Sequence, residues 1–130
     1  CYDLRFPEMF RLLVEHGAEI ICLPAAFTQV TGAAHWHSLV RARAIENQVF
    51  MIAADQGGVH SEKRSTYGHS MIVDPWGVVL ADQAQGEGVV LADIDRNSMV
   101  KIRSQIPVLE NRRIISGSTS IPVEVVHAQD

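Results

Sequence analysis

The sequence contains few cysteines, no long apolar run and no excess of positive charge, and each absence excludes a class of protein. Two cysteines, Cys1 and Cys22, are too few for a disulfide framework, which predicts a reduced, cytoplasmic protein. No apolar stretch approaches the roughly 20 residues of a membrane span, so no membrane partner is expected. The formal net charge of −4 argues against nucleic acid as a partner.

What is present is the composition of an ordinary globular domain. Hydrophobic residues make up 47% of the 130 residues and charged residues 20%. The length is that of one domain with a sizeable core.

The apolar pattern predicts alternating helices and strands. In chain order we expect a helix from Pro7 to Gly17, a strand at 19–24, a loop at 25–34, a helix at 35–48, a strand at 49–55, a polar loop at 56–68, two strands within 69–82 joined by a turn at 74–77, a strand at 89–95, a helix at 98–106 capped by Asp95 or Asn97, and an extended tail from Ile115. The strands at 19–24 and 49–55 are apolar throughout, which is typical of buried parallel strands. Together these elements predict an α/β protein with a layered sheet.

Cys1 is the first candidate for chemistry. It stands just before a helix start, where the helix dipole, nearby N–H groups and the positive charge of Arg5 favour a thiolate. The backbone N–H of Tyr2 is then free to face a developing oxyanion. The alternative is a buried structural cysteine. Cys22, inside an apolar run, is expected to be such a core residue.

Several motifs resemble one known family. They read CYDLRFPE, LPAAFTQVTGAAHW, RARAIENQ, YGHSMIVDPWG and IPVLENRR, and they extend in order from residue 1 to residue 113. These motifs are similar to those of the nitrilase, or carbon–nitrogen hydrolase, superfamily. Within that superfamily they most resemble the motifs of the Nit-type amidase branch, which includes deaminated glutathione amidase.

The resemblance implies a four-layer α-β-β-α sandwich, a Glu-Lys-Cys triad and a thioester intermediate. In the family the glutamate and lysine precede the cysteine motif. We therefore expect residues 1–130 to be the C-terminal part of a single carbon–nitrogen hydrolase domain, inactive alone. The resemblance also implies a small-molecule amide substrate, no metal or other cofactor, and a homo-oligomer for the full-length protein.

The same resemblance assigns roles in substrate binding to three residues. Arg5 is expected to bind a substrate carboxylate, for which its planar guanidinium is suited. The alternative for Arg5 is a local ion pair with Asp3 or Glu8. Phe27 and Thr31 match positions that line the pocket, where they would provide an apolar wall and a hydroxyl.

Three charged residues near these motifs are expected to stabilise the fold. Arg41, Arg43 and Glu46 share one predicted helix and are expected to be structural, shaping the floor beneath Cys1, with Arg43 and Glu46 paired.

Four histidines, at positions 35, 37, 60 and 69, suggest a metal site. His35 and His37 point to different sides of a helix, which disfavours a shared metal ion. His37 stands where the family usually has an acid, so an ion pair there is in doubt. His69 is expected to hydrogen-bond at the start of a strand.

The reaction that the resemblance implies is hydrolysis of the C–N bond of a small carboxylate-bearing amide through a thioester on Cys1. Two alternatives remain open. One is a non-catalytic Nit-like binding module. The other is an N-terminal-nucleophile hydrolase that uses the Cys1 amine as its base, although Pro7 and Glu8 lead this chain into a helix rather than a strand.

Overall fold

The computed structural model describes residues 1–114, so the extended tail expected from Ile115 lies outside the described residues. The elements in chain order are the 3-10 turn η1 (Tyr2–Arg5), α1 (Pro7–Glu15), β1 (Ile20–Ala25), α2 (Gln29–Asn47), β2 (Phe50–Asp55), β3 (Gly57–Ser61), β4 (Arg64–Tyr67), β5 (Ser70–Val73), β6 (Val79–Gln83) and α3 (Arg96–Gln105).

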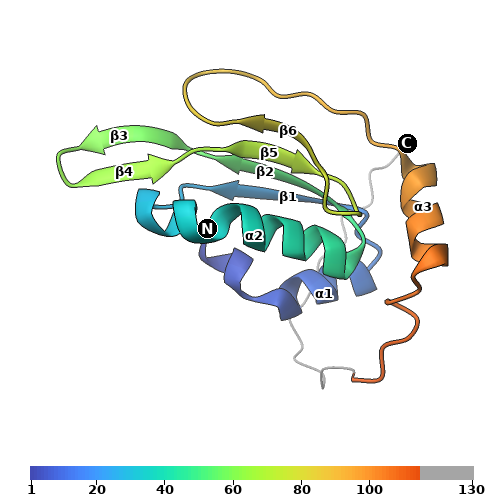
Figure 1. Ribbon diagram of the computed structural model, residues 1–130. Helices are drawn as coiled ribbons and strands as arrows, with labels where there is room; N and C mark the ends of the chain where they lie inside the picture. Colours follow the sequence, from blue (N-terminus) through green and yellow to red (C-terminus); the bar gives the residue numbers. More distant parts are fainter. Residues whose placement is uncertain (115–130) are drawn as a thin grey trace, which may run out of the picture.

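Four of the strands form one sheet in the order β1-β2-β5-β6. β1 and β2 are parallel, whereas β5 and β6 continue the sheet in antiparallel pairs. α1 and α2 pack on one face of this sheet, and α3 stands at one of its ends (Figure 1). The α/β class and the parallel pairing of β1 with β2 are therefore confirmed. The expected burial holds for most of β2, but every second residue of β1 is exposed.

The core lies between the sheet and the two helices. Its largest buried side chains come from η1, the helices and the central strands, namely Leu4, Phe10, Trp36, Val40, Met51 and Met71. β1 alternates between this core and the opposite face of the sheet. On that opposite face Ile20, Cys22 and Pro24 are exposed, so the expectation that Cys22 is a core residue is wrong for the described part of the chain.

The second helix is longer than its sequence pattern predicts. α2 begins at Gln29 instead of residue 35, with Thr28 as its N-cap, so most of the expected loop at 25–34 is helical. Gly32 made this first turn resemble a loop in the sequence. In the structure Gly32 is buried where α2 meets Tyr67 of β4, and tertiary packing offsets its low helix propensity.

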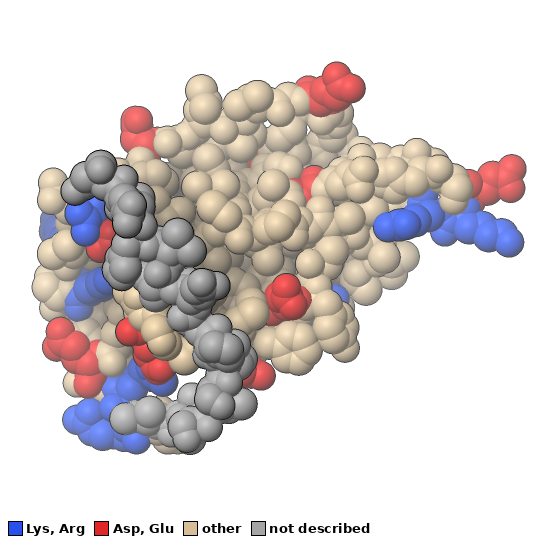
Figure 2. Space-filling view, turned by 180° about the vertical axis from the view of Figure 1, so that it is seen from behind, with Lys and Arg blue, Asp and Glu red and all other residues tan. Residues whose placement is uncertain are grey.

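The polar segment at 56–68 is a β-hairpin and not the expected loop. β3 and β4 pair antiparallel and project from the body of the molecule (Figure 1). Seen from behind, charged side chains gather at its tip (Figure 2), where Glu62 and Lys63 connect the strands. Both faces of β3 are largely exposed, and its sequence GGVHS lacks the apolar alternation that marks a strand in sequence.

The turn between β5 and β6 is confirmed at residues 74–77. The Asp74 carboxylate accepts the N–H groups of Trp76 and Val78, and Gly77 donates to the Asp74 carbonyl.

The strand expected at 89–95 is absent from the described residues, because this segment pairs with no strand there. Val89 and Leu91 are each 83% exposed.

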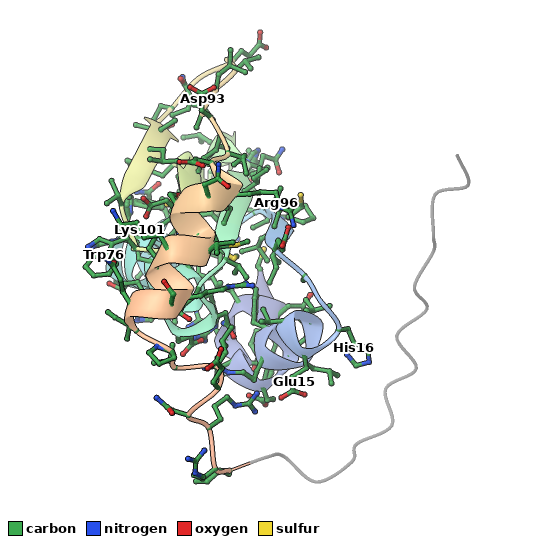
Figure 3. All side chains as sticks on the ribbon, turned by 90° about the vertical axis from the view of Figure 1, so that its right-hand side faces the viewer. Glu15, His16, Trp76, Asp93, Arg96 and Lys101 are labelled. Carbon is green, nitrogen blue, oxygen red and sulfur yellow. The ribbon has the colours of Figure 1, made fainter. Side chains whose placement is uncertain are left out.

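α3 confirms the expected last helix, with Asp95 as its cap. The Asp95 carboxylate accepts the N–H of Asn97 at 2.9 Å. Across the junction with α2, Arg103 donates to the main-chain carbonyl of Gln48, and the Gln48 side chain donates to the main-chain carbonyl of Ile106. At the start of α3 (Figure 3), Arg96 hydrogen-bonds Glu19 and thereby lowers the pKa of that carboxyl.

Among residues 1–114, no helix is both long and apolar enough to cross a membrane.

Candidate active site

Cys1 lies where the 3-10 turn η1 meets the loop that follows β1. Its Sγ accepts the backbone N–H of Ala26 at 2.9 Å, and the side chain is exposed. An N–H aimed at the sulfur stabilises negative charge there. The alternative of a buried structural cysteine is therefore wrong for Cys1 in the described residues.

The buried guanidinium of Arg43 holds the turn that follows Cys1. Its Nε and Nη2 donate to the Leu4 carbonyl at 3.1 and 2.8 Å. Its Nη1 donates to Glu46 at 2.9 Å, and the charge lies 5.6 Å from the centre of the Phe10 ring. Because Leu4 belongs to η1, Arg43 fixes the segment between Cys1 and Arg5. The expected pairing of Arg43 with Glu46 and its structural role under this turn are confirmed.

One cavity collects all five residues that the sequence singles out. Its volume is about 170 Å³, and its lining consists of Cys1, Tyr2, Arg5, Ala26, Phe27, Thr28 and Thr31. η1 supplies one wall, and the β1–α2 connection with the first turn of α2 supplies the other. The fold therefore joins two segments about 25 residues apart into one site.

Arg5 faces this cavity and pairs with neither Asp3 nor Glu8. Its guanidinium lies 5.3 Å from the centre of the Phe27 ring, and its Nη1 is 3.3 Å from Nδ1 of His35. Phe27 in turn packs against Trp36 with ring centres 5.0 Å apart. The charge of Arg5 is thus held over an aromatic face at the cavity wall and remains partly exposed to solvent.

Asp55, at the end of β2, supports the loop that carries Phe27. Its Oδ1 accepts the Phe27 N–H at 2.7 Å, and the residue is only 5% exposed. Burial raises the pKa of this carboxyl, while the hydrogen bond from Phe27 acts in the opposite direction. Within the described residues, Oδ2 of Asp55 has no hydrogen-bond partner.

Sequence reasoning missed Ala26, Thr28 and Asp55, and it considered His35 only as a metal ligand. Ala26 and Thr28 flank Phe27, and the hydroxyls of Thr28 and Thr31 are 2.6 Å apart across the first turn of α2, a spacing that the sequence could have indicated. Asp55 lies 28 residues from its partner Phe27, and no local pattern connects them.

His37 and His69 lie outside this cavity and share a different partner. Both imidazoles hydrogen-bond the carboxylate of Asp82. The hydrogen bond expected for His69 at the start of a strand is confirmed. His37, on α2, hydrogen-bonds Asp82 of β6 at 2.9 Å.

A comparison with protein-family models matches residues 1–104 to the carbon–nitrogen hydrolase model. The chain belongs to the carbon–nitrogen hydrolase family. A curated relative from Bos taurus, named deaminated glutathione amidase, is 56% identical over 113 residues, which cover 87% of this chain and 34% of that protein. This carbon–nitrogen hydrolase chain thus spans about a third of that relative's length.

Solved structures agree with the family assignment. The NitFhit protein of C. elegans superposes with a TM-score of 0.84 at 48% identity, covering 87% of this chain and 27% of that one. A variant of the amidase from Nesterenkonia sp. AN1 superposes with a TM-score of 0.70 at 27% identity, covering 87% and 39%. That structure shows the acetamide moiety of fluoroacetamide added covalently at its active site cysteine. This chain therefore has the nitrilase-superfamily fold.

Proposed function

We propose that the full-length protein hydrolyses the C–N bond of a small carboxylate-bearing amide through a thioester on Cys1. One observation carries the proposal. The Cys1 sulfur and the Arg5 guanidinium, a nucleophile and a carboxylate-binding group, line the same 170 Å³ cavity.

Cys1 is the nucleophile in this proposal, and Cys22 is not. Cys1 opens onto the cavity and accepts the Ala26 N–H, whereas Cys22 lies on the far face of the sheet, away from α1 and α2. The covalent adduct at the active site cysteine of the Nesterenkonia amidase supports a cysteine nucleophile for this family. A thiolate is the reactive form of cysteine, and the Ala26 N–H favours it.

Arg5 selects the substrate class in this proposal. A guanidinium can form two parallel hydrogen bonds with a carboxylate. The Arg5 guanidinium lies over the Phe27 ring, and both residues line the cavity. The Thr31 hydroxyl adds a polar contact on the same wall. Relatives are named for deaminated glutathione, and a glutathione derivative carries carboxylates. We propose a substrate of this type.

The reaction proceeds in two steps. The Cys1 thiolate attacks the amide carbon, the C–N bond breaks, and the nitrogen leaves as ammonia with an added proton. Water then attacks the thioester, which releases the carboxylic acid and restores the thiol. The Tyr2 N–H stabilises the oxyanion in both steps.

The proton donor and the second oxyanion group lie outside this chain in our proposal. The family resemblance implies a glutamate that protonates ammonia and then activates water, and a lysine beside the oxyanion. We propose that the described residues form the C-terminal part of one domain, which contributes nucleophile and carboxylate site to it.

The nucleophile is tested in the full-length protein with an ω-amide of a short dicarboxylic acid. Cys1→Ala should abolish hydrolysis and retain substrate binding, and Cys1→Ser should be very slow. Cys22→Ala is the matched control and should retain turnover. Near-normal turnover by Cys1→Ala, or loss of turnover in Cys22→Ala alone, contradicts the proposal.

The substrate class is tested with Arg5→Lys on matched charged and neutral amides. Lysine keeps the charge but loses the two-pronged hydrogen bond, which costs about 1–3 kcal/mol, or roughly 5- to 150-fold in kcat/KM. We expect this loss only for carboxylate-bearing amides. Equal losses of kcat/KM on both amides would mean that Arg5 has a structural role and does not bind the substrate carboxylate.

A non-catalytic binding module is the second candidate, since the cavity residues alone can bind a ligand. The same assay separates the two. Binding of the ω-amide without turnover by the wild-type full-length protein favours the binding module.

A further inference from the structure

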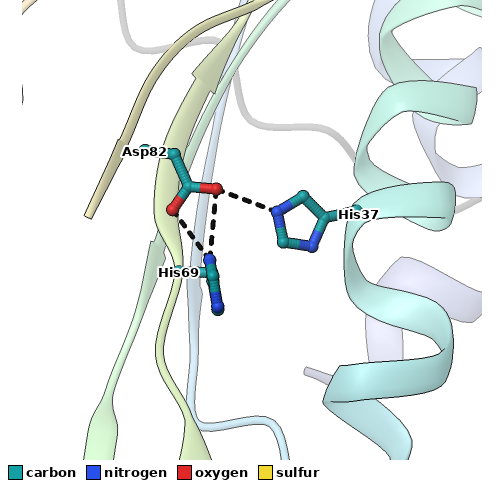
Figure 4. Close-up of side chains that lie close together, drawn as sticks. All are labelled: His37, His69 and Asp82. Atoms are coloured by element: carbon teal, nitrogen blue, oxygen red, sulfur yellow. Dashed lines mark hydrogen bonds and ion pairs between the residues drawn. The ribbon is translucent and has the colours of Figure 1, made fainter. Parts of the chain in front are cut away.

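A second cluster of polar side chains joins α2 to the edge of the sheet. His37 comes from α2, His69 from the residue before β5, and Asp82 from β6 (Figure 4). Nε2 of His37 lies 2.9 Å from Oδ2 of Asp82. Nδ1 of His69 lies 2.9 Å from Oδ1 and 3.1 Å from Oδ2 of the same carboxylate. Two imidazole nitrogens therefore converge on one carboxylate oxygen.

The backbone at His69 is held in an uncommon conformation that aims its ring at Asp82. His69 has a φ of 60°, in the left-handed region that non-glycine residues seldom occupy. The indole N–H of Trp36 donates to the His69 carbonyl at 2.8 Å, and the His69 N–H donates to Ala84 at 3.1 Å. The Tyr67 ring stacks on the imidazole at 4.5 Å. Three contacts thus fix the position of one donor.

We propose that His37, His69 and Asp82 form a binding site for a divalent transition-metal ion such as Zn²⁺. The three donor atoms lie within 4.8 Å of one another. A tetrahedral zinc ion with ligand distances of about 2.0–2.2 Å needs donor separations of roughly 3.3 Å. The two imidazole nitrogens lie 2.9 and 3.1 Å from Oδ2 of Asp82 and within 4.8 Å of each other, so holding the ion requires the two imidazoles to approach by at most about 1.5 Å. Two imidazoles and one carboxylate are a donor set that zinc binds well.

The site is accessible and leaves room for water. The side chains of His37, His69 and Asp82 are 36%, 25% and 28% exposed, so an ion can enter from solvent and keep a water as its fourth ligand. The sequence did not reveal this set, because His37 and Asp82 are 45 residues apart.

A bound ion would connect α2 to β6, which is the last strand in the sheet order. We expect it to stabilise the fold, since a ligand that binds only the native state raises the melting temperature. The inference is independent of the amidase proposal, because the cluster shares no residue with the lining of the Cys1 cavity.

The test is a titration of the metal-free full-length protein with Co²⁺, whose visible spectrum reports its ligands. We expect the bands of a nitrogen- and oxygen-ligated site, without the near-ultraviolet band of a thiolate ligand from Cys1 or Cys22. His37→Gln and Asp82→Asn should each weaken binding at least about tenfold. His16→Gln is the matched control, because His16 is an exposed histidine outside the cluster.

A thermal melt with and without Zn²⁺ gives a second readout. We expect Zn²⁺ to raise the melting temperature of the wild type and of His16→Gln, and to leave that of His37→Gln unchanged. His37 is a partly exposed helix residue, so this variant should fold even if substitutions at His69 do not. Absence of Co²⁺ bands at millimolar metal, purely thiolate-type bands, or equal binding by His37→Gln and wild type would overturn the proposal.

Discussion

Replacing Arg43 with methionine should destabilise the protein and disturb the site, although Arg43 touches no substrate. Methionine keeps an unbranched apolar stem beside Phe10 but removes every N–H donor. The substitution therefore deletes both hydrogen bonds to the Leu4 carbonyl and the contact with Glu46.

The expected cost follows from burial. Leu4 is fully buried, so its carbonyl loses its side-chain donors with little access to water, which costs about 1–3 kcal/mol. The contact with Glu46, whose side chain is 34% exposed, adds at most about 1 kcal/mol after screening by solvent. We expect a loss of about 1–4 kcal/mol in the free energy of unfolding.

Arg41→Met is the matched control on the same helix. Arg41 also donates to a backbone carbonyl, that of Gly77 at 2.8 Å, but Arg41 itself is exposed. Water can replace much of that bond, so we expect a loss of about 0.5–1 kcal/mol.

Urea denaturation of both full-length variants measures the difference, and kcat/KM on the ω-amide reports the site. Arg43→Met should lower kcat/KM under conditions where it is fully folded, because the turn from Cys1 to Arg5 loses its anchor. Equal destabilisation by the two variants, or an unchanged kcat/KM for folded Arg43→Met, would refute this reasoning.

Three further predictions concern packing, pH and the isolated chain. Gly32→Ala should destabilise the protein by about 1–3 kcal/mol in urea denaturation despite alanine's higher helix propensity, because a Cβ there would overlap Tyr67; a stabilised variant would contradict this. Since burial raises the pKa of Asp55, the native state binds more protons than the unfolded state at pH values between the ordinary pKa of 3.8 and the raised native pKa. The free energy of unfolding therefore falls as pH rises through this window. Asp55→Asn should remove this part of the fall in denaturation curves recorded across that window, and an unchanged slope would argue against it. Residues 1–130 expressed alone should show no cooperative thermal melt and no turnover, because Ile20 and Cys22 lie on an exposed sheet face; a cooperative melt with turnover would instead favour the N-terminal-nucleophile alternative.

Local patterns determined much of the fold. Pro7 and Glu8 begin α1, the apolar run at 19–24 forms β1, and Asp95 caps α3, because caps and apolar runs act through neighbours in the chain. The sequence and its resemblance to the carbon–nitrogen hydrolase family also identified five of the seven residues that line the Cys1 cavity, all except Ala26 and Thr28. Their chemical roles remain predictions.

Only tertiary structure decided the features that depend on distant partners. The first turn of α2 forms around Gly32 because Tyr67 packs against it, and the hairpin at 57–67 pairs two strands that carry no apolar alternation.

The same holds for buried and clustered polar groups. Arg43 could form a surface ion pair in any helix, and only the fold places the Leu4 carbonyl against it. His37 and Asp82 meet because β6 lies at the sheet edge beside α2. The sequence determines which groups can bind or react, and long-range packing determines which of them lie within bonding distance.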